Sequence, residues 1–197
     1  SELNRLNLDN DKQKIFGITG CDSIVAKDTL WKVLYDHFGV KANRFIPLTY
    51  LVNNKEDVNR FISEYKPGNK YILKKNIQRQ EGIIVSDNKA DILNKITKDP
   101  SYVVIQQLLT NPFLLNGRKI NCRVYLLVLC KQNSVNVYYY KDGFMYYTRE
   151  KFNKNNLTVD NFVTTGYIDR KVYIENPLTL YDFRKWLDKN KYSSKRF

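Results

Sequence analysis

The sequence predicts a mixed fold, in which helices and strands alternate along a chain of 197 residues. Segments with apolar residues three or four positions apart alternate with segments whose apolar residues recur at every second position. Short polar breaks rich in Pro, Gly and Asn separate these segments. Apolar residues make up 43% of the chain, enough for a sizeable core. No run reaches the roughly 20 apolar residues that a membrane helix needs.

Helices are predicted where the apolar spacing is helical. The segment 27–38 shows this spacing, and Gly39 follows it as a stop signal. A second helix is predicted at about 55–65, with Asn54 as its N-cap. Two more are predicted, one starting at Asp87 and Asn88 and one running from a Thr179/Asp182 capping arrangement to about Asn190.

Strands are predicted at 70–74, 82–86, 102–108, 118–130, 135–140 and 144–148. The period of two in the segment 118–130 places Lys119, Asn121 and Arg123 on one face. The Asp142-Gly143 pair predicts a hairpin between the last two strands. Because Tyr138, Tyr139 and Tyr140 alternate along a strand, at least one of these rings is expected in the core.

Charge and composition exclude several kinds of protein. The single histidine and three scattered cysteines argue against a zinc site and a Ser-His-Asp mechanism. Without a Cys-x-x-Cys pair a disulfide framework is not expected, and the polar N-terminus has no signal-peptide core. We therefore expect a cytoplasmic protein. The formal charge of +13 predicts an anionic partner, which charge alone leaves open among nucleic acid, nucleotide, membrane surface and acidic protein tail.

Two short patterns could carry chemistry, although neither a Walker loop nor a G-x-G-x-x-G motif occurs. One is the polar basic strand Lys119-x-Asn121-x-Arg123, and the other lies earlier in the chain. Lys74 ends a predicted strand and Gly82 begins the next, with a polar loop between them. A strand lysine can hold a phosphate as a point charge, and a glycine lets a backbone N–H approach it. A strand-end lysine is also commonly a solvated surface cation, so both interpretations stay open.

The order of these motifs resembles the tubulin tyrosine ligase-like family of ATP-grasp ligases. In sequence come Ile72-Leu-Lys74, Gly82-Ile-Ile-Val, Gln106-x-x-x-x-Asn-Pro112, Gly117-x-Lys119 and Arg123-x-Tyr125. Upstream, Lys27-Asp28 stands at the family's basic-acidic pair. The likeness covers roughly residues 15 to 190, and its most specific part is the run at 106–125.

The resemblance implies an α+β fold of ATP-grasp-like type, with antiparallel sheets, packed helices and a small N-terminal lobe. It implies three lobes, which are a mainly helical one at 1–66, a central one at 67–110 and an incomplete C-terminal one at 111–197. A nucleotide would lie between two sheets. With ATP and magnesium, family members make an acyl-phosphate and join amino acids to protein carboxylates, often on tubulin tails.

The resemblance also implies roles for individual residues. Lys74 would bind the α- or β-phosphate, Gly82 would lie in the phosphate loop, and Lys119 would contact the nucleotide. Arg123 would be the catalytic residue, facing the phosphates or the incoming substrate. The segment Gln106, Gln107, Leu108 and Leu109 would form the hinge whose backbone reads adenine.

The chain also departs from the family pattern. Lys75 replaces a proline, Gln80 a glycine, Asn121 an aspartate and Tyr146 a basic residue, and Phe162-Val-Thr-Thr165 stands where His-Leu-Thr-Asn is usual. The chain reaches Phe197 without the segment that carries the family's Asp and Glu-x-Asn magnesium ligands. Either the sequence is a fragment, residues are missing from it, or the protein lacks this site, so no metal ligand is assigned.

Three functions follow as hypotheses. The first is a ligase of this family with weak or no turnover, acting on an acidic protein or peptide tail such as the tubulin C-terminus. The second is a non-catalytic module that binds a nucleotide or an acidic partner. The third, a nucleic-acid binder, is disfavoured because no recognition motif accompanies the charge. The positive charge is expected around the nucleotide cleft, from Lys74, Lys75, Arg79, Lys119 and Arg123.

Overall fold

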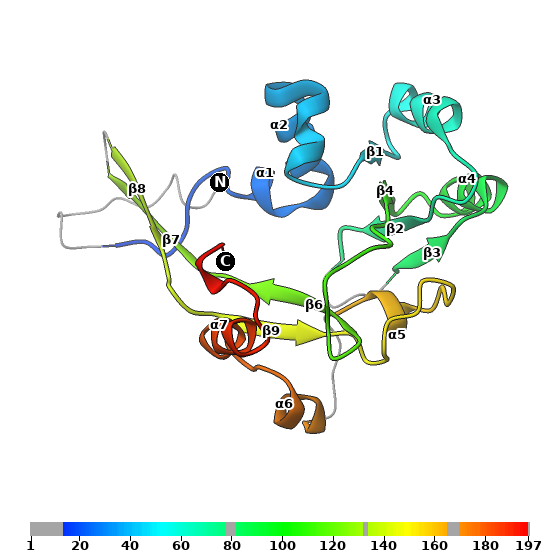
Figure 1. The fold of residues 1–197 in the computed structure, drawn as a ribbon. Coiled ribbons are helices and arrows are strands. Elements are labelled where there is room, and N and C mark those ends of the chain that lie inside the picture. The colour runs from blue at the N-terminus through cyan, green and yellow to red at the C-terminus, as the bar shows by residue number, and fades with distance from the viewer. Residues whose placement is uncertain (1–13, 78–81, 132–133, 165–169, 197) are drawn as a thin grey trace. The chain divides into compact units, whose positions relative to one another are not determined.

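The computed structural model describes residues 14–77, 82–131, 134–164 and 170–196, which fall into two compact units (Figure 1). Unit 1 contains the described residues up to 77 and residues 82–108. Unit 2 contains the described residues from 109 onward. Both units combine helices with antiparallel strands, which confirms the predicted α+β class. The three-lobe division stays a prediction.

Unit 1 is built on a four-stranded sheet with the order β1-β4-β2-β3. All neighbouring strands run antiparallel. The strands are β1 (Thr49–Leu51), β2 (Tyr71–Lys75), β3 (Ile84–Ser86) and β4 (Tyr102–Gln107). The helices are α1 (Asp22–Val25), α2 (Lys27–Phe38), η2 (Gly39–Arg44), α3 (Lys55–Glu64) and α4 (Lys89–Lys98).

The core of unit 1 lies between this sheet and the helices α3 and α4. Phe61 of α3 and Ile92 of α4 are fully buried with Leu73 of β2 and Ile105 of β4. The predicted caps are confirmed: Asn54 accepts hydrogen bonds from two N–H groups of α3, and Asn88 accepts one from α4. Each cap satisfies N–H groups that the helix itself leaves unpaired.

Unit 2 contains a three-stranded sheet, β5-β6-β9, and a separate pair, β7-β8. Its strands are β5 (Leu114–Leu115), β6 (Arg118–Arg123), β7 (Leu126–Lys131), β8 (Ser134–Tyr139) and β9 (Phe144–Tyr147). Its helices are α5 (Val159–Phe162), α6 (Lys171–Glu175), α7 (Leu180–Lys189) and η3 (Ser194–Arg196). Leu115, Met145 and Leu180 are fully buried in its core. The predicted Thr179/Asp182 capping box opens α7.

The predicted continuous strand 118–130 and the Asp142-Gly143 hairpin are both wrong. β6 pairs with β9 and β7 with β8, whereas β8 and β9 are not paired. Between the Arg123–Phe144 pair and the Leu126–Tyr139 pair, the segment from Arg123 to Leu126 advances three positions. The segment from Tyr139 to Phe144, which runs opposite to it, advances five. Asp142-Gly143 thus lies in an irregularity of the long antiparallel run. Sequence periodicity could not reveal this irregularity, because the alternation of side chains between the two strand faces continues through Val124 and Tyr125.

The tyrosine prediction is also wrong. The side chains of Tyr138, Tyr139 and Tyr140 are between 53% and 60% exposed. The β7–β8 ribbon extends away from β6 and β9 within unit 2 (Figure 1). Every described residue of β8 is exposed, so neither face of this strand is covered by the described part of the chain. A two-stranded ribbon has no second layer against which an alternating ring could be buried.

Cys21, Cys122 and Cys130 are free thiols. In the part of the chain that the structure describes, no helix is both long and apolar enough to cross a membrane.

Replacement of Gly143 should destabilise unit 2. A Cβ at this position would lie 2.1 Å from the backbone oxygen of Arg123 and 3.1 Å from Leu180 Cδ1. Because a strand backbone and a buried leucine cannot move away cheaply, Gly143→Ala should cost about 1–3 kcal/mol or more. Urea unfolding measures the loss.

Gly68→Ala is the matched control for this prediction. Gly68 has φ +87°, but a Cβ added to it would meet no atom within 4 Å, so only the backbone penalty of about 1–2 kcal/mol applies. At Gly143, by contrast, the cost is steric. Loss of the β6–β9 amide protection in Gly143→Ala alone is expected, and unchanged protection there would contradict the steric explanation.

Candidate functional site

Unit 1 brings Lys74 and Gln106, two of the predicted nucleotide-binding residues, into direct contact. Lys74 Nζ donates to Gln106 Oε1 at 2.6 Å. The amide nitrogen of Gln106 donates to Thr49 Oγ1 at 2.8 Å, and this hydroxyl donates to Pro47 O at 2.8 Å. The three side chains come from β2, β4 and β1, which are adjacent in the sheet. The strand pairing therefore orients the Lys74 ammonium through a chain of hydrogen bonds.

Thr49 is a site neighbour that sequence reasoning missed. The nearby Pro47 favours a loop at this position, but Thr49 begins β1 and is buried. Its Cα lies opposite that of Gln106 in the β1–β4 register. A three-residue strand at the sheet edge gives little periodic signal, so only the pairing with β4 reveals it.

Lys75 has a different partner from Lys74. Its Nζ lies 2.6 Å from Asp99 Oδ2 and 4.9 Å from the centre of the Tyr102 ring. The hydrogen bond from Lys75, followed by those from Ser101, lowers the pKa of Asp99 to about 2. The same bond raises the pKa of Lys75. Lys75 is thus committed to an ion pair within unit 1.

Gly82 packs against the stem of Lys75. Its φ is +69°, in the region that favours glycine, and a Cβ there would lie 2.5 Å from Lys75 Cδ. This position thus has both a backbone and a spatial reason for glycine. Arg79 and Gln80, which the sequence analysis placed in the same loop, lie outside the described residues.

The predicted hinge continues β4 out of the sheet. The Gln107 N–H donates to Leu48 O and the Leu108 N–H to Lys70 O, both at 2.8 Å. Leu108 is buried, whereas Leu109, the first residue of unit 2, is 58% exposed. The N–H groups of Gln107 and Leu108 are therefore already used, so base reading here would depend on carbonyl oxygens and on the other N–H groups of the hinge.

In unit 2, β6 carries Lys119 in a desolvated position. Its Nζ donates to the backbone oxygen of Phe162 at 3.1 Å. Burial lowers the pKa of Lys119, because the charged form loses hydration. Among the described ion pairs, none joins this lysine to a carboxylate. A half-buried cation with only a carbonyl partner is costly for folding, which makes it a candidate for binding an anion.

Arg123 lies on the same strand and stacks on an aromatic ring. Its Cζ is 4.7 Å from the centre of the Tyr146 ring on β9. Tyr146 is opposite Asn121 in the β6–β9 register. In the row formed by Lys119, Asn121 and Arg123, an amide thus lies between two cations. The Arg123 guanidinium is held by a cation–π contact with Tyr146 of the neighbouring strand.

The segment around Phe162 is structural in this chain. Phe162 is buried against Phe152, with ring centres 5.3 Å apart, and Thr164 is buried as well. The preceding Asn161 is fully buried, and its side chain bonds the backbone at Asn153 and Asn156. Sequence reasoning missed Asn161, and a buried amide leaves no periodic signature. Thr165 lies outside the described residues.

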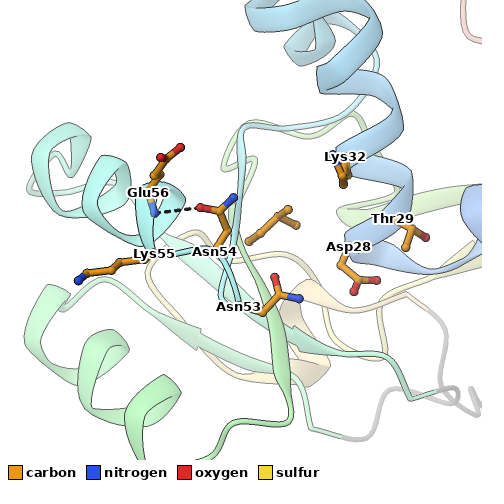
Figure 2. Close-up of a pocket in the computed structure, with 8 residues that line it drawn as sticks. Asp28, Thr29, Lys32, Asn53, Asn54, Lys55 and Glu56 are labelled. Atoms are coloured by element: carbon orange, nitrogen blue, oxygen red, sulfur yellow. Dashed lines mark hydrogen bonds between the residues drawn. The ribbon is translucent and has the colours of Figure 1, made fainter.

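Unit 1 also has an open cleft of about 580 Å³ that the sequence did not predict. Figure 2 shows that its lining comes from the first turns of α2 and from the turn between β1 and α3. The residues that line it are Asp28, Thr29, Lys32, Leu51, Asn53, Asn54, Lys55 and Glu56. None of the predicted nucleotide-binding residues belongs to this set, and both charge signs are present in it.

Metal-binding side chains do not gather in the described residues. Within those ranges, no three His, Cys, Asp or Glu side chains lie closely enough together to hold a metal ion. The residues predicted to bind a nucleotide are cationic or glycine, which are Lys74 and Gly82 in unit 1 and, separately, Lys119 and Arg123 in unit 2. Residues of these types suit phosphate oxygens, but they supply no magnesium ligand.

Comparison with known families identifies the family of this chain. The model of the tubulin-tyrosine ligase family matches residues 6–176, so the chain belongs to this family. The human probable tubulin polyglutamylase TTLL2 is 27% identical over 150 residues, which cover 70% of this chain and 24% of the human protein. The mouse tubulin monoglutamylase TTLL4 is 24% identical over 156 residues, covering 77% of this chain and 12% of that protein.

A third relative has a different named activity. Tubulin glycylase 3C of Tetrahymena thermophila is 29% identical over 81 residues, or 41% of this chain and 8% of the glycylase. The chain thus spans about a quarter or less of the length of these relatives. The family is shown by the match, while the activity of the relatives belongs to proteins that are much longer.

Lys119→Met should leave the protein as stable or make it more stable at neutral pH. The substitution keeps the apolar stem and removes a desolvated charge, for which a gain of about 0.5–2 kcal/mol is expected. Because the folded-state pKa of Lys119 is lowered, the unfolded chain holds the extra proton between that pKa and the ordinary value of 10.5. Wild-type stability should therefore rise with pH across this window relative to the variant.

Lys154→Met is the control, because Lys154 is exposed in the same unit. It should change the free energy of unfolding at neutral pH by less than about 0.5 kcal/mol. Urea titrations at several pH values measure the free energy of unfolding and, for the wild type and Lys119→Met, its pH slope. A clear loss of stability in Lys119→Met would show that its bond to Phe162 is a net stabilising contact.

Proposed function

We propose that this chain carries the nucleotide-binding part of an ATP-dependent ligase that joins amino acids to protein carboxylates. The observation that carries the proposal is the contact between Lys74 and Gln106. These residues are 32 positions apart and belong to two separate family-like motifs, yet they meet at 2.6 Å. Membership of the tubulin-tyrosine ligase family supports the reaction class.

In this proposal the residues of unit 1 bind the ground state of the nucleotide. Lys74, held by Gln106, binds a phosphate oxygen as a point charge. The backbone at Gly82 approaches the phosphates, and the stretch from Gln106 to Leu109 borders the base. In unit 2, considered by itself, Lys119 is a cation whose desolvation a bound anion would offset. When bound, ATP with magnesium would supply the phosphoryl group that activates a carboxylate.

The proposed acceptor is an acidic protein or peptide tail. The formal charge of +13 favours association with anionic chains, and the named activities of the relatives concern tubulin. A tubulin C-terminal tail therefore fits the acceptor's chemistry. Three free thiols suit a reducing compartment, so we place the activity in the cytoplasm.

A second candidate function is a module that binds a nucleotide or an acidic partner without catalysis. The stacking of Arg123 on Tyr146 favours it, because the candidate catalytic cation is engaged by a ring. Asn121, opposite Tyr146, cannot supply the negative charge of an aspartate. Groups that act on the transition state are thus replaced, while those that bind a ground state are kept.

Lys74→Ala should weaken binding of a non-hydrolysable ATP analogue by about 10- to 100-fold, the range for loss of a charged hydrogen bond. Calorimetry with and without magnesium measures the affinity. Lys98→Ala removes the same charge from the exposed end of α4 and should change affinity little. Equal effects of the two substitutions would overturn the phosphate role of Lys74, since the affinity would then depend only on the net charge of the protein.

Residues 1–197 as a polypeptide should incorporate amino acids into an acidic tail peptide weakly or not at all. Each missing transition-state group costs about 10²–10³ in rate, and Asn121 and Tyr146 replace two of them. Incorporation of a radiolabelled amino acid measures turnover. Robust incorporation would contradict the weak-turnover proposal, and its loss in Arg123→Ala would then establish catalysis by Arg123.

A further inference from the structure

Helix α2 is capped by a residue from a distant part of the chain. Its own N-cap, Ala26, has no side chain that could accept a hydrogen bond. The Lys27 N–H instead donates to Asn76 Oδ1 at 3.2 Å. Asn76 lies 49 residues later, directly after the end of β2. An asparagine oxygen on the first N–H groups of a helix is the usual capping interaction, here made across the fold.

Asp28 orients this cap. The Asn76 amide nitrogen donates to Asp28 Oδ1 at 2.8 Å, so its oxygen must point toward the Lys27 N–H. The Lys27 Nζ donates to Ile77 O at 3.3 Å, which adds a third bond between the two segments. Asp28 sits in the first turn of α2, where a carboxylate is favoured by the helix dipole. Figure 2 shows Asp28 on α2 at the edge of the cleft described above.

The part of β2 that this contact holds is the part that carries Lys74. Lys74 pairs with Val104, but Lys75 pairs with Tyr102, so the register shifts between the two lysines. The β2–β4 hydrogen-bond ladder therefore becomes irregular directly after Lys74, the residue whose side-chain orientation the proposed phosphate contact requires. Asn76 is two residues beyond Lys74 and is tied to a 12-residue helix.

We propose that Asn76 and Asp28 are positioning residues, which fix the end of β2 against α2 and so hold Lys74 in its orientation for a nucleotide phosphate. This role rests on the proposed nucleotide function. Neither side chain needs to touch the nucleotide. The basic-acidic pair Lys27-Asp28 thus acquires a physical role, because its backbone N–H and its carboxylate bind the two ends of one amide group.

The test uses variants that remove or restore the contact. Asn76→Ala removes both of its bonds, and Asp28→Ala removes only the orienting carboxylate. The double variant Asp28→Asn/Asn76→Asp exchanges the two groups: the carboxylate at position 76 can accept from the Lys27 N–H and from the new amide at position 28. Asn54→Ala, which removes the local cap of α3, is the matched control for lost capping.

Two measurements are made on the full chain. Amide exchange at Lys27, followed by NMR, should be about 2- to 30-fold faster in Asn76→Ala, the range for loss of a cap. Affinity for a non-hydrolysable ATP analogue should fall by about 2- to 30-fold in Asn76→Ala and Asp28→Ala. The double variant should return to within about twofold of wild type, and Asn54→Ala should bind like wild type.

The sign of the Asp28→Ala effect separates positioning from charge. Removal of a carboxylate should strengthen binding of an anion if only the local field matters, so weaker binding supports positioning. Binding that is equal or stronger in Asp28→Ala, or equally weak in Asn54→Ala, would overturn the inference. If wild type binds no analogue, the proposed function fails and the positioning role with it. The Lys27 exchange rates then still decide whether the cap exists.

Discussion

The antiparallel pairing of β2 with β4 is the constraint on which unit 1 depends. It places Leu73 and Ile105 in the core beneath α3 and α4. The same register places Ile72 opposite Gln106, so the next residue of the same strand face, Lys74, can reach the Gln106 amide. Because side chains alternate across a strand, one face of the β2–β4 ladder packs beneath α3 and α4, and the other face carries the polar network next to the buried Ile72 and Val104. A slip of one residue would exchange these roles.

The charged groups of the two units differ in their contribution to the free energy of folding. Lys75 and Asp99 form an ion pair that is accessible to water, in which each group favours the charged state of the other. Lys119 is desolvated and has a carbonyl partner, so its charge is held against the preference of its surroundings. Cations held in this way are typical of sites that bind anions, because the ligand restores the interactions that burial removed. The contrast separates a structural lysine from a functional candidate better than charge alone.

In unit 2 the irregularity at Asp142 and Gly143 connects the strands to α7. Asp142 Oδ1 accepts from the N–H of Gly143 and from that of Tyr181 in α7. The Leu180 N–H donates to Gly143 O, and the Met145 N–H donates to Leu178 O. A residue pair that usually closes a hairpin is therefore used to attach a helix. The separation of β8 from β9 and the docking of α7 have this common cause.

The sequence by itself determined the class of fold, the family resemblance and the long helices α2, α3, α4 and α7. The helix 27–38, the caps Asn54 and Asn88, and the Thr179/Asp182 capping box depend on neighbours within a few positions, and local chemistry suffices for them. Only the tertiary structure decided which strands pair, because the period of two runs unbroken through Val124 and Tyr125. It also decided that Lys74 meets Gln106 while Lys75 meets Asp99, and that Asn76 caps α2. These contacts join residues 24 to 49 positions apart, whose meeting depends on strand register and packing rather than on any local pattern.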